Sequence, residues 1–479
     1  MDQTSVIQSL DKIVSAIGNV VWGPFMLTLL VGTGLLLTFR LQLLQFWQLP
    51  YALKQVFSVK NRSENNNADE GDVSHFGALM IALSATIGTG NIAGVATAVA
   101  LGGPGAVFWM WMTALVGMAT KYGEAVLAVK YRQVNSKNEM SGGTMYYIEK
   151  GLGLKWLAVL FALFAVLASF GIGSSVQSNS VADVVYGTFH IQPLVTGIVL
   201  TVLTGVVLLG GVQWISKVSS VIVPLMAVGY VAGGILILLM NVEVLGTAVS
   251  IIFTDAFSAR AVAGGTFGSM VRFGVARGVF SNEAGMGSAP IAAAAAKTDH
   301  SVRQALVSMT GTFLDTIIVC SITGIVLVMG LIKMNMIDPI SGQYLVKNIT
   351  VGAKLTTDTF EYMLPGFGGI LVTVGLIFFA YSTVLGWCYY GEKCVSYLMG
   401  DRFIVLYRLL YTITVLLGCL VVQTGVKTDQ AGVKLVWNIA DTFNGLMAIP
   451  NLIALLLLSS VIVAETQDFM DKRKRGILK

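Results

Sequence analysis

The residues best suited to bind a small polar ligand lie at the centre of an apolar stretch, residues 76–105. Glycine in a helix interior costs about 1 kcal/mol relative to alanine, and serine, threonine and asparagine side chains compete for backbone hydrogen bonds. The stretch is long enough to cross a bilayer, yet these residue types fill its middle, at Ser84, Thr86, Gly88, Thr89, Gly90 and Asn91. We therefore expect a membrane helix that breaks halfway. Unpaired backbone groups at such a break must face protein or a polar cavity, so a polar ligand is expected there.

A second stretch of the same kind lies far along the chain. Residues 280–285 read F-S-N-E-A-G, and residues 89–94 read T-G-N-I-A-G. Both lie in glycine-rich segments, and both precede alanine-rich helical runs. The match is short, so its meaning depends on how the apolar segments around it are arranged.

The composition indicates a membrane protein with many helical spans. The chain is 55% hydrophobic and 11% charged, whereas soluble domains carry about 25% charged residues. The net charge of +5 is small and is better explained by membrane topology than by nucleic-acid binding. Neither disulfides nor a zinc site is expected, because no metal-type spacing connects the four cysteines, Cys320, Cys388, Cys394 and Cys419.

Apolar runs and charges together predict the topology. An amphipathic segment at 43–59 suits an interfacial helix, and a polar linker follows at 61–72. With the basic C-terminal tail in the cytoplasm, loops on that side hold about 20 Lys and Arg, against about 7 on the other side. The N-terminus is then outside. We predict eleven spans, at residues 14–39, 76–105, 105–131, 156–186, 194–211, 219–240, 268–296, 305–332, 365–397, 403–422 and 435–464.

The spans form two sets of five, and the first helix of each set is one of the broken ones. Because five is odd, the second set must be inverted relative to the first. An inverted repeat with broken first helices is typical of a secondary transporter whose site lies at mid-membrane. The predicted division is an extra N-terminal helix, interfacial helix and cytoplasmic linker (1–75), two repeats (76–241 and 242–465) and a basic cytoplasmic tail (466–479).

The chain also resembles a known family, the alanine or glycine:cation symporters. The resemblance rests on GTGNIAGVA (88–96), GGPGAVFWMW (102–111), ARGVFSNEAGMGSAP (276–290) and Gly386-Trp387, and it extends over nearly the whole chain. It implies an all-α fold of the leucine-transporter (LeuT) type and sodium-coupled uptake of glycine and alanine. It also implies a place in the prokaryotic inner membrane.

A zwitterionic amino acid needs partners for both of its charges, because each is costly to bury unpaired. Its carboxylate should meet the amides of Gly90 and Asn91 and the hydroxyl of Thr89 at the start of a half-helix. Its ammonium should meet carbonyls near Phe280 and Ser281. The resemblance further implies substrate contacts from Gln177, Phe280, Thr383 and Trp387. A wall of Phe280 and Trp387 would admit only a hydrogen or a methyl group as the side chain of the substrate.

A sodium ion needs several oxygen ligands from a dehydrated pocket. The broken helix is expected to supply carbonyls around Ala85 and Gly88, and residues 365–397 supply the hydroxyls of Ser382 and Thr383. This pairing matches the place where the LeuT-type fold holds its common sodium ion.

Ionisable residues within the spans have several readings. Lys121 and Glu124 suit a structural pair, and Arg277 and Glu283 either gate the pathway or neutralise each other. Asp183 and Asp315 should face the bundle, since a lipid-facing carboxylate is costly, and a proton relay through Asp315 stays open.

Other function classes fit less well. An intramembrane protease would need H-E-x-x-H or a buried nucleophile and base, and the three histidines lie in loops or at span ends. Channels commonly build a carbonyl ring from several short subunits. A proton-coupled amino-acid symporter and a transporter-like amino-acid sensor remain as alternatives.

Overall fold

The computed structural model describes residues 3–57, 70–136, 138–257, 266–346, 349–425 and 431–478. These residues are almost entirely helical, which agrees with the predicted all-α class. The described part contains one small hairpin, in which β1 (Gln133–Val134) pairs antiparallel with β2 (Met140–Ser141). Most of the predicted polar linker, and the last two residues of the predicted interfacial helix, lie outside the described residues.

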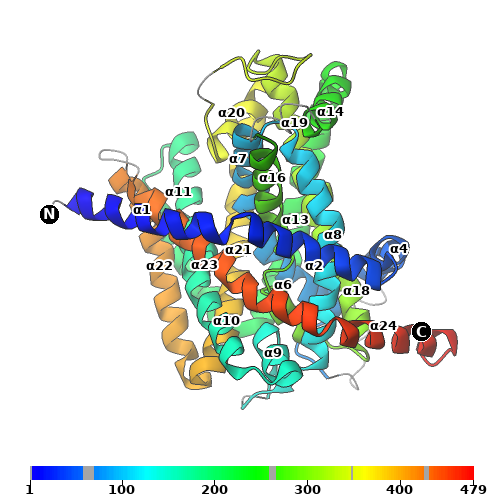
Figure 1. The fold of residues 1–479 in the computed structure, drawn as a ribbon. Coiled ribbons are helices and arrows are strands. Elements are labelled where there is room, and N and C mark those ends of the chain that lie inside the picture. Colours follow the sequence, from blue (N-terminus) through cyan, green and yellow to red (C-terminus); the bar gives the residue numbers. More distant parts are fainter. Residues whose placement is uncertain are drawn as a thin grey trace.

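The chain begins with two consecutive helices, α1 (Gln3–Val21) and α2 (Pro24–Arg40), that cross the bundle obliquely (Figure 1). They are separated at Gly23, and Pro24 then occupies the first turn of α2, where its missing N–H costs nothing. α1 packs along α23 (Ala431–Leu457), and α2 packs along α8 (Ala106–Lys130). Two short helices follow where an interfacial helix is predicted, α3 (Leu44–Trp47) and α4 (Leu49–Phe57).

The remaining helices form the bundle in Figure 1. The first group comprises α6 (His75–Thr86), η1 (Thr89–Asn91), α7 (Ala93–Gly102), α8, α9 (Thr144–Leu152), α10 (Lys155–Ala168), η2 (Ser169–Ser175), α11 (Val176–Phe189), α12 (Pro193–Leu209) and α13 (Gly211–Met240). The second comprises α14 (Val242–Ala256), α16 (Thr266–Asn282), α17 (Pro290–Ala294), α18 (Ser301–Thr312), η3 (Phe313–Cys320), α19 (Ser321–Lys333), α20 (Ala353–Met363), α21 (Gly368–Met399), η4 (Asp401–Phe403), α22 (Ile404–Gly425), α23 and α24 (Ser459–Lys474).

Seven helices in the described part are long and apolar enough to cross a membrane. The bent pair α6 and α7 makes an eighth if it is counted as one span. Three other predicted spans coincide with helices that are not among these eight. They are 105–131 (α8), 194–211 (α12) and 268–296 (α16 and α17). A multi-pass helical membrane protein is therefore supported, and the count of eleven spans stays a prediction.

Both predicted helix breaks are present. α6 and α7 are bent by 59° at the first break. At the second, α16 ends at Asn282 and α17 begins at Pro290. Three residues between them, Glu283, Gly285 and Gly287, have positive φ values of 56°, 87° and 81°. Left-handed backbone is accessible to glycine and costs other residues about 1–2 kcal/mol, so these glycines allow the chain to turn out of the helix.

The helices at the predicted spans 156–186 and 305–332 contain π-helical segments. η2 lies between α10 and α11, and η3 lies between α18 and α19. A π-segment inserts an extra residue into a helix and often marks a functional site. Gln177 lies in the first turn after η2, and Asp315 lies within η3.

The apolar core consists of two clusters of buried side chains. The larger contains Phe280, Trp387 and Tyr390, and the smaller contains Tyr230 and Phe360. The predicted aromatic wall of the ligand site is therefore part of the packed interior.

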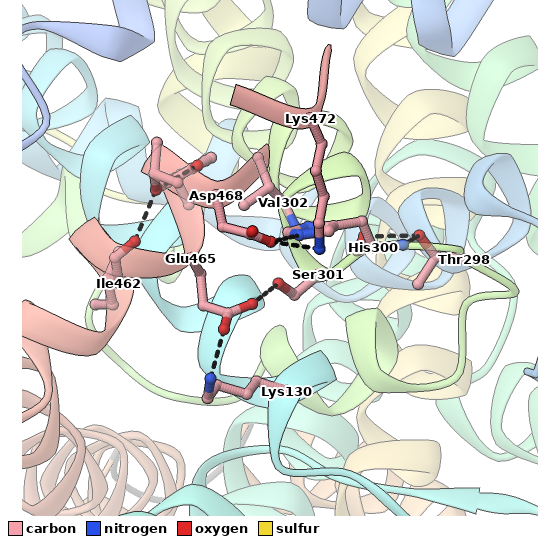
Figure 2. Close-up of polar contacts among 11 residues, drawn as sticks. Lys130, Thr298, His300, Ser301, Val302, Ile462, Glu465, Asp468 and Lys472 are labelled. Carbon is pink, nitrogen blue, oxygen red and sulfur yellow. Dashed lines mark hydrogen bonds and ion pairs between the residues drawn. The ribbon is translucent and has the colours of Figure 1, made fainter. Parts of the chain in front are cut away.

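The C-terminal helix α24 contacts α8 and α18 (Figure 2). The carboxylate of Glu465 pairs with the ammonium of Lys130 and accepts a hydrogen bond of 2.9 Å from the hydroxyl of Ser301. One turn further on, Asp468 lies 3.1 Å from Nε2 of His300. These contacts attach α24 to two helices of the bundle.

Candidate functional site

The first break is held open by two side chains that take over its backbone amides. In a continuous helix, Gly88 N–H would bond to the Ser84 carbonyl, and Thr89 N–H to the Ala85 carbonyl. Instead, Gly88 N donates to Oδ1 of Asn91 at 2.9 Å, and Thr89 N donates to Oε1 of Gln177 at 3.2 Å. The carbonyls of Ser84 and Ala85 are thereby released from the helix pattern.

Gln177 reaches this break from a fixed position. Its Nε2 donates to the Ile172 carbonyl in η2 at 3.0 Å, so its Oε1 is the end directed at the break. The hydroxyl of Thr89 is fully buried and has no hydrogen-bond partner among the described residues. A buried polar group without a partner costs about 1–3 kcal/mol, which a bound ligand would recover.

An oxygen cluster lies behind the break. The hydroxyl of Thr383 lies 3.0 Å from the Ser84 carbonyl, 3.3 Å from the Ile87 carbonyl and 3.0 Å from the Phe379 carbonyl. The hydroxyl of Ser382 lies 3.4 Å and 2.9 Å from the Ser84 and Phe379 carbonyls. Two hydroxyls supply only two hydrogens, and Thr383 can donate to only one of its three neighbours. A cluster of oxygen atoms with so few donors suits a hard cation such as sodium.

The two breaks lie directly against each other. A Cβ added at Gly90 would lie 3.1 Å from Cα of Ser281 and 3.2 Å from Cδ1 of Phe280. A Cβ at Gly88 would lie 2.5 Å from the Thr383 hydroxyl and 3.2 Å from Oε1 of Gln177. A side chain at Gly88 would therefore displace the Thr383 hydroxyl, and one at Gly90 would press on the second broken helix.

Asp315 joins the two breaks. Its Oδ1 accepts a hydrogen bond of 2.7 Å from Nδ2 of Asn91 in the first break. Its Oδ2 accepts from the hydroxyl of Ser281 beside the second break at 2.8 Å, and from that of Thr316 at 2.7 Å. The carboxylate is fully buried. A carboxylate that accepts one hydrogen bond from each broken helix, and a third from its own helix, couples the positions of both breaks.

Trp387 is a buried residue of α21, and its side chain is held by contacts on two sides. Its indole Nε1 donates to Oε1 of Glu283 at 2.9 Å, and the other oxygen of Glu283 accepts from the hydroxyl of Ser288 at 2.6 Å. On the opposite side, its Cβ packs so closely on Gly173 that no side chain would fit there. The indole is therefore fixed in place beside the second break.

Glu124 holds the second break from α8. Its Oε1 accepts from the amides of Gly285 and Gly287, each at 3.1 Å, and from Nδ2 of Asn451 at 2.6 Å. The predicted structural pair with Lys121 is not formed as a hydrogen bond, since Nζ of Lys121 has no hydrogen-bond partner in the described part of the chain. The other carboxylate oxygen of Glu124, Oε2, also has no hydrogen-bond partner among the described residues.

A cavity of about 420 Å³ leads toward Phe280 between α1, α16 and α23. Arg277 crosses this cavity wall, with its guanidinium 5.2 Å from the centre of the Phe280 ring and 3.5 Å from Oδ2 of Asp441. Arg277 therefore pairs with Asp441, while Glu283 binds Trp387 and Ser288. The reading in which Arg277 and Glu283 neutralise each other is wrong.

The predicted site residues lie close together, except that the carbonyls at the predicted ion site belong to neighbouring residues. Thr89, Gly90, Asn91 and Gln177 lie at the first break, Phe280 and Ser281 beside the second, and Ser382, Thr383 and Trp387 on α21. The carbonyls at the Thr383 hydroxyl are those of Ser84 and Ile87, each one residue before the predicted Ala85 and Gly88. Sequence reasoning left the roles of Asp315 and Glu283 open and did not predict that they contact the two breaks and Trp387. Asp315 could have been recognised as important because a carboxylate within an apolar span is costly unless it has partners.

The fold is shared with a known transporter structure. MhsT, solved in complex with L-phenylalanine, superposes with a TM-score of 0.61 at 17% identity, over 83% of this chain and 93% of its own. This likeness supports the expected LeuT-type fold.

Comparison with known sequences identifies the family. Residues 7–479 match the sodium:alanine symporter family. The sodium/alanine symporter AgcS of Methanococcus maripaludis is 56% identical over 97% of this chain and 98% of its own. The putative sodium/proton-dependent alanine carrier protein YrbD of Bacillus subtilis is 38% identical over 97% of this chain and 93% of its own. The chain belongs to the sodium:alanine symporter family.

Proposed function

We propose that this chain is a sodium-coupled symporter that takes up glycine and alanine by alternating access. Its family supports sodium-coupled amino-acid symport. One observation carries the proposal: Asn91 and Gln177 hold the amides of the first break and so release carbonyls toward Thr383. The same two side chains thus shape an ion site and, one residue further on, a site for an organic anion.

The substrate carboxylate is proposed to bind at the start of η1 and α7. The amides of Gly90 and Asn91 lie at this half-helix start, where the helix dipole favours negative charge. The buried hydroxyl of Thr89 supplies a further donor. The ammonium binds carbonyls near Phe280 and Ser281, which contact Gly90 across the gap between the breaks.

The size of the substrate side chain is proposed to be limited by Phe280 and Trp387. The indole of Trp387 is held by Glu283 on one edge and packs on Gly173 on the other, so it cannot move aside without losing contacts. In a hydrophobic pocket of fixed width, each extra methylene group costs about 1–3 kcal/mol. Hydrogen and methyl side chains are therefore accepted and larger ones are not.

Sodium is proposed to bind between the end of α6 and α21. The ligands are the hydroxyls of Ser382 and Thr383 together with carbonyls from Ser84 to Gly88. The C-terminal end of α6 also carries the negative end of its helix dipole, which favours a cation. The ion neutralises this end of the broken helix and so stabilises the break that binds the substrate.

Access is proposed to alternate around Asp315, with the two repeats at residues 76–241 and 242–465 as the moving parts. Under the predicted orientation, with the N-terminus outside, the cavity at Phe280 opens outward. Arg277 and Asp441 then lie across the outer route, where separation of the ion pair would widen it.

The test is uptake of radiolabelled glycine and alanine into liposomes that contain the purified protein. Three conditions are compared: a sodium gradient, a proton gradient and neither. We expect glycine and alanine to accumulate in the liposomes under the sodium gradient, and not under the other two conditions. The name of the 38% identical relative includes proton dependence, so accumulation with protons alone would replace sodium in the proposal. Binding without accumulation would favour a sensor.

A further inference from the structure

A second polar groove lies far from the candidate substrate site, at the end of the bundle that carries the C-terminus. Its volume is about 750 Å³. One wall comes from the end of α2 and from α3, and the other comes from α24. The groove contacts neither helix break, so sodium-coupled symport leaves it unexplained.

The charged residues that line this groove are mainly cationic. Arg40 contributes from the first wall, and Arg473 and Lys474 contribute from the second. The one carboxylate in the lining is that of Asp471. The adjacent Lys472 instead pairs with Asp468, with its ammonium 2.7 Å from Oδ2, on the side of α24 that faces the bundle (Figure 2).

Arg473 is held in a geometry that suits an anionic oxygen ligand. Its guanidinium carbon lies 3.8 Å from the centre of the Tyr51 ring of α4. Stacking uses the flat face of a guanidinium, whereas its N–H donors point outward in the plane and match phosphate bidentately. Arg40 is anchored as well, through a hydrogen bond to the hydroxyl of Ser459. Both cations are thus positioned before any ligand binds.

Exposed apolar residues lie next to the groove-lining residues along the chain, and one of them, Trp47, lines the groove itself. Phe39, Leu43, Phe46 and Trp47 are between 46% and 72% exposed. The chain turns here through two left-handed residues, Gln42 and Leu43, and the indole of Trp47 donates to the Gln42 carbonyl at 3.0 Å across that turn. Tryptophan at the end of a membrane-spanning helix is typical of the level of the lipid headgroups.

We propose that this groove binds the phosphate of an anionic phospholipid, with its acyl chains along Phe39, Leu43 and Phe46. Charge and shape complementarity support this occupant. The cations match a phosphodiester, and the exposed apolar residues that neighbour them along the chain match hydrocarbon chains beside the predicted cytoplasmic membrane surface. A bound lipid bridges α2 and α24, and α24 is attached to α8 and α18 through Glu465 and Asp468.

The experiment uses the full-length protein, purified and delipidated in detergent. Native mass spectrometry measures the affinity for phosphatidylglycerol and for phosphatidylcholine, with inorganic phosphate as a competitor. A cation near a membrane surface contributes about 1 kcal/mol to binding, which is about a fivefold change in affinity. We therefore expect phosphatidylglycerol to bind more tightly, and the double variant Arg473→Gln/Lys474→Gln to bind it about 25-fold more weakly.

The matched control is Arg475→Gln, which removes an exposed cation from the same helix end without touching the groove lining. It should change the affinity less than twofold. Equal loss in this control would overturn the site in favour of general surface attraction. Equal affinity for phosphatidylcholine, or full competition by millimolar phosphate, would overturn the anionic lipid as occupant. Melting temperatures of wild type and variants without lipid show whether the substitutions impair folding. The single variant Lys474→Gln is measured in the same way, since it keeps the contact between Arg473 and Tyr51.

Discussion

Replacement of Thr383 by valine tests the ion site most directly. Valine has nearly the same shape as threonine, so the substitution removes the hydroxyl and leaves the packing of α21 against α6. That hydroxyl lies 3.0–3.3 Å from three carbonyl oxygens. A hydrogen bond or ligand contact to a charged group contributes about 1.5–3 kcal/mol, and 1.4 kcal/mol is tenfold in affinity. We expect the sodium concentration for half-maximal uptake to rise about 10- to 150-fold.

The assay is alanine uptake into proteoliposomes over a range of sodium concentrations, at fixed membrane potential. Thr383→Ser keeps the hydroxyl and serves as the matched control, with an expected change below about threefold. Saturating sodium should restore most of the uptake by Thr383→Val, because the valine does not touch the predicted carboxylate site. A wild-type sodium response in an active Thr383→Val variant would refute the assignment of this oxygen cluster as the ion site.

Four further predictions concern the break, the pocket and the C-terminal helix. Trp387→Ala should raise the ratio of valine to alanine uptake at least about tenfold, and an unchanged ratio would show that the indole does not limit the pocket. Gly90→Ala should abolish uptake because its Cβ meets the backbone of Ser281, whereas Gly94→Ala, with open space around its Cβ, should keep it. Asp315→Asn leaves at least one of three donors without an acceptor, at about 1–3 kcal/mol, so uptake should fall at least fivefold. Wild-type uptake and melting temperature would mean that this carboxyl group is already neutral. Hydrogen bonds from Lys472 and His300 hold the pKa of Asp468 below its ordinary value of 3.8. The stabilisation is therefore complete above pH 3.8 and disappears as the pH falls through the folded-state pKa. The difference in melting temperature between wild type and Asp468→Asn should disappear in the same range, and a persistent difference would indicate packing.

The helix breaks were predictable because they follow from local residue types. Gly88, Thr89, Gly90 and Asn91 weaken a helix wherever they occur together, and the same argument applies to the glycines after Asn282. The convergence of Gln177, Phe280 and Trp387 came from resemblance to a family. Spacing alone does not show that three distant spans meet.

The parts that were not predicted depend on contacts between helices. The π-segment that contains Asp315 forms within an apolar run whose periodicity gives no sign of an extra residue. The choice of Ser84 over Ala85 as the nearest carbonyl depends on which amide Asn91 captures. The role of Glu124 was missed because Lys121 offered an apparent partner one turn away, whereas the actual partners are amides of a distant break.

The hydrogen bond between Trp387 and Glu283 has a consequence for how this transporter can evolve. Glu283 supplies both the left-handed residue that turns the chain out of α16 and the carboxylate that anchors the indole. A mutation that frees the tryptophan for a larger substrate leaves a buried carboxylate oxygen without its donor, in the segment that forms the turn. Under the proposed pocket, a change of specificity at Trp387 therefore keeps its stability only when Glu283 changes as well. A single change at either position would alter selectivity and lower the stability of the protein.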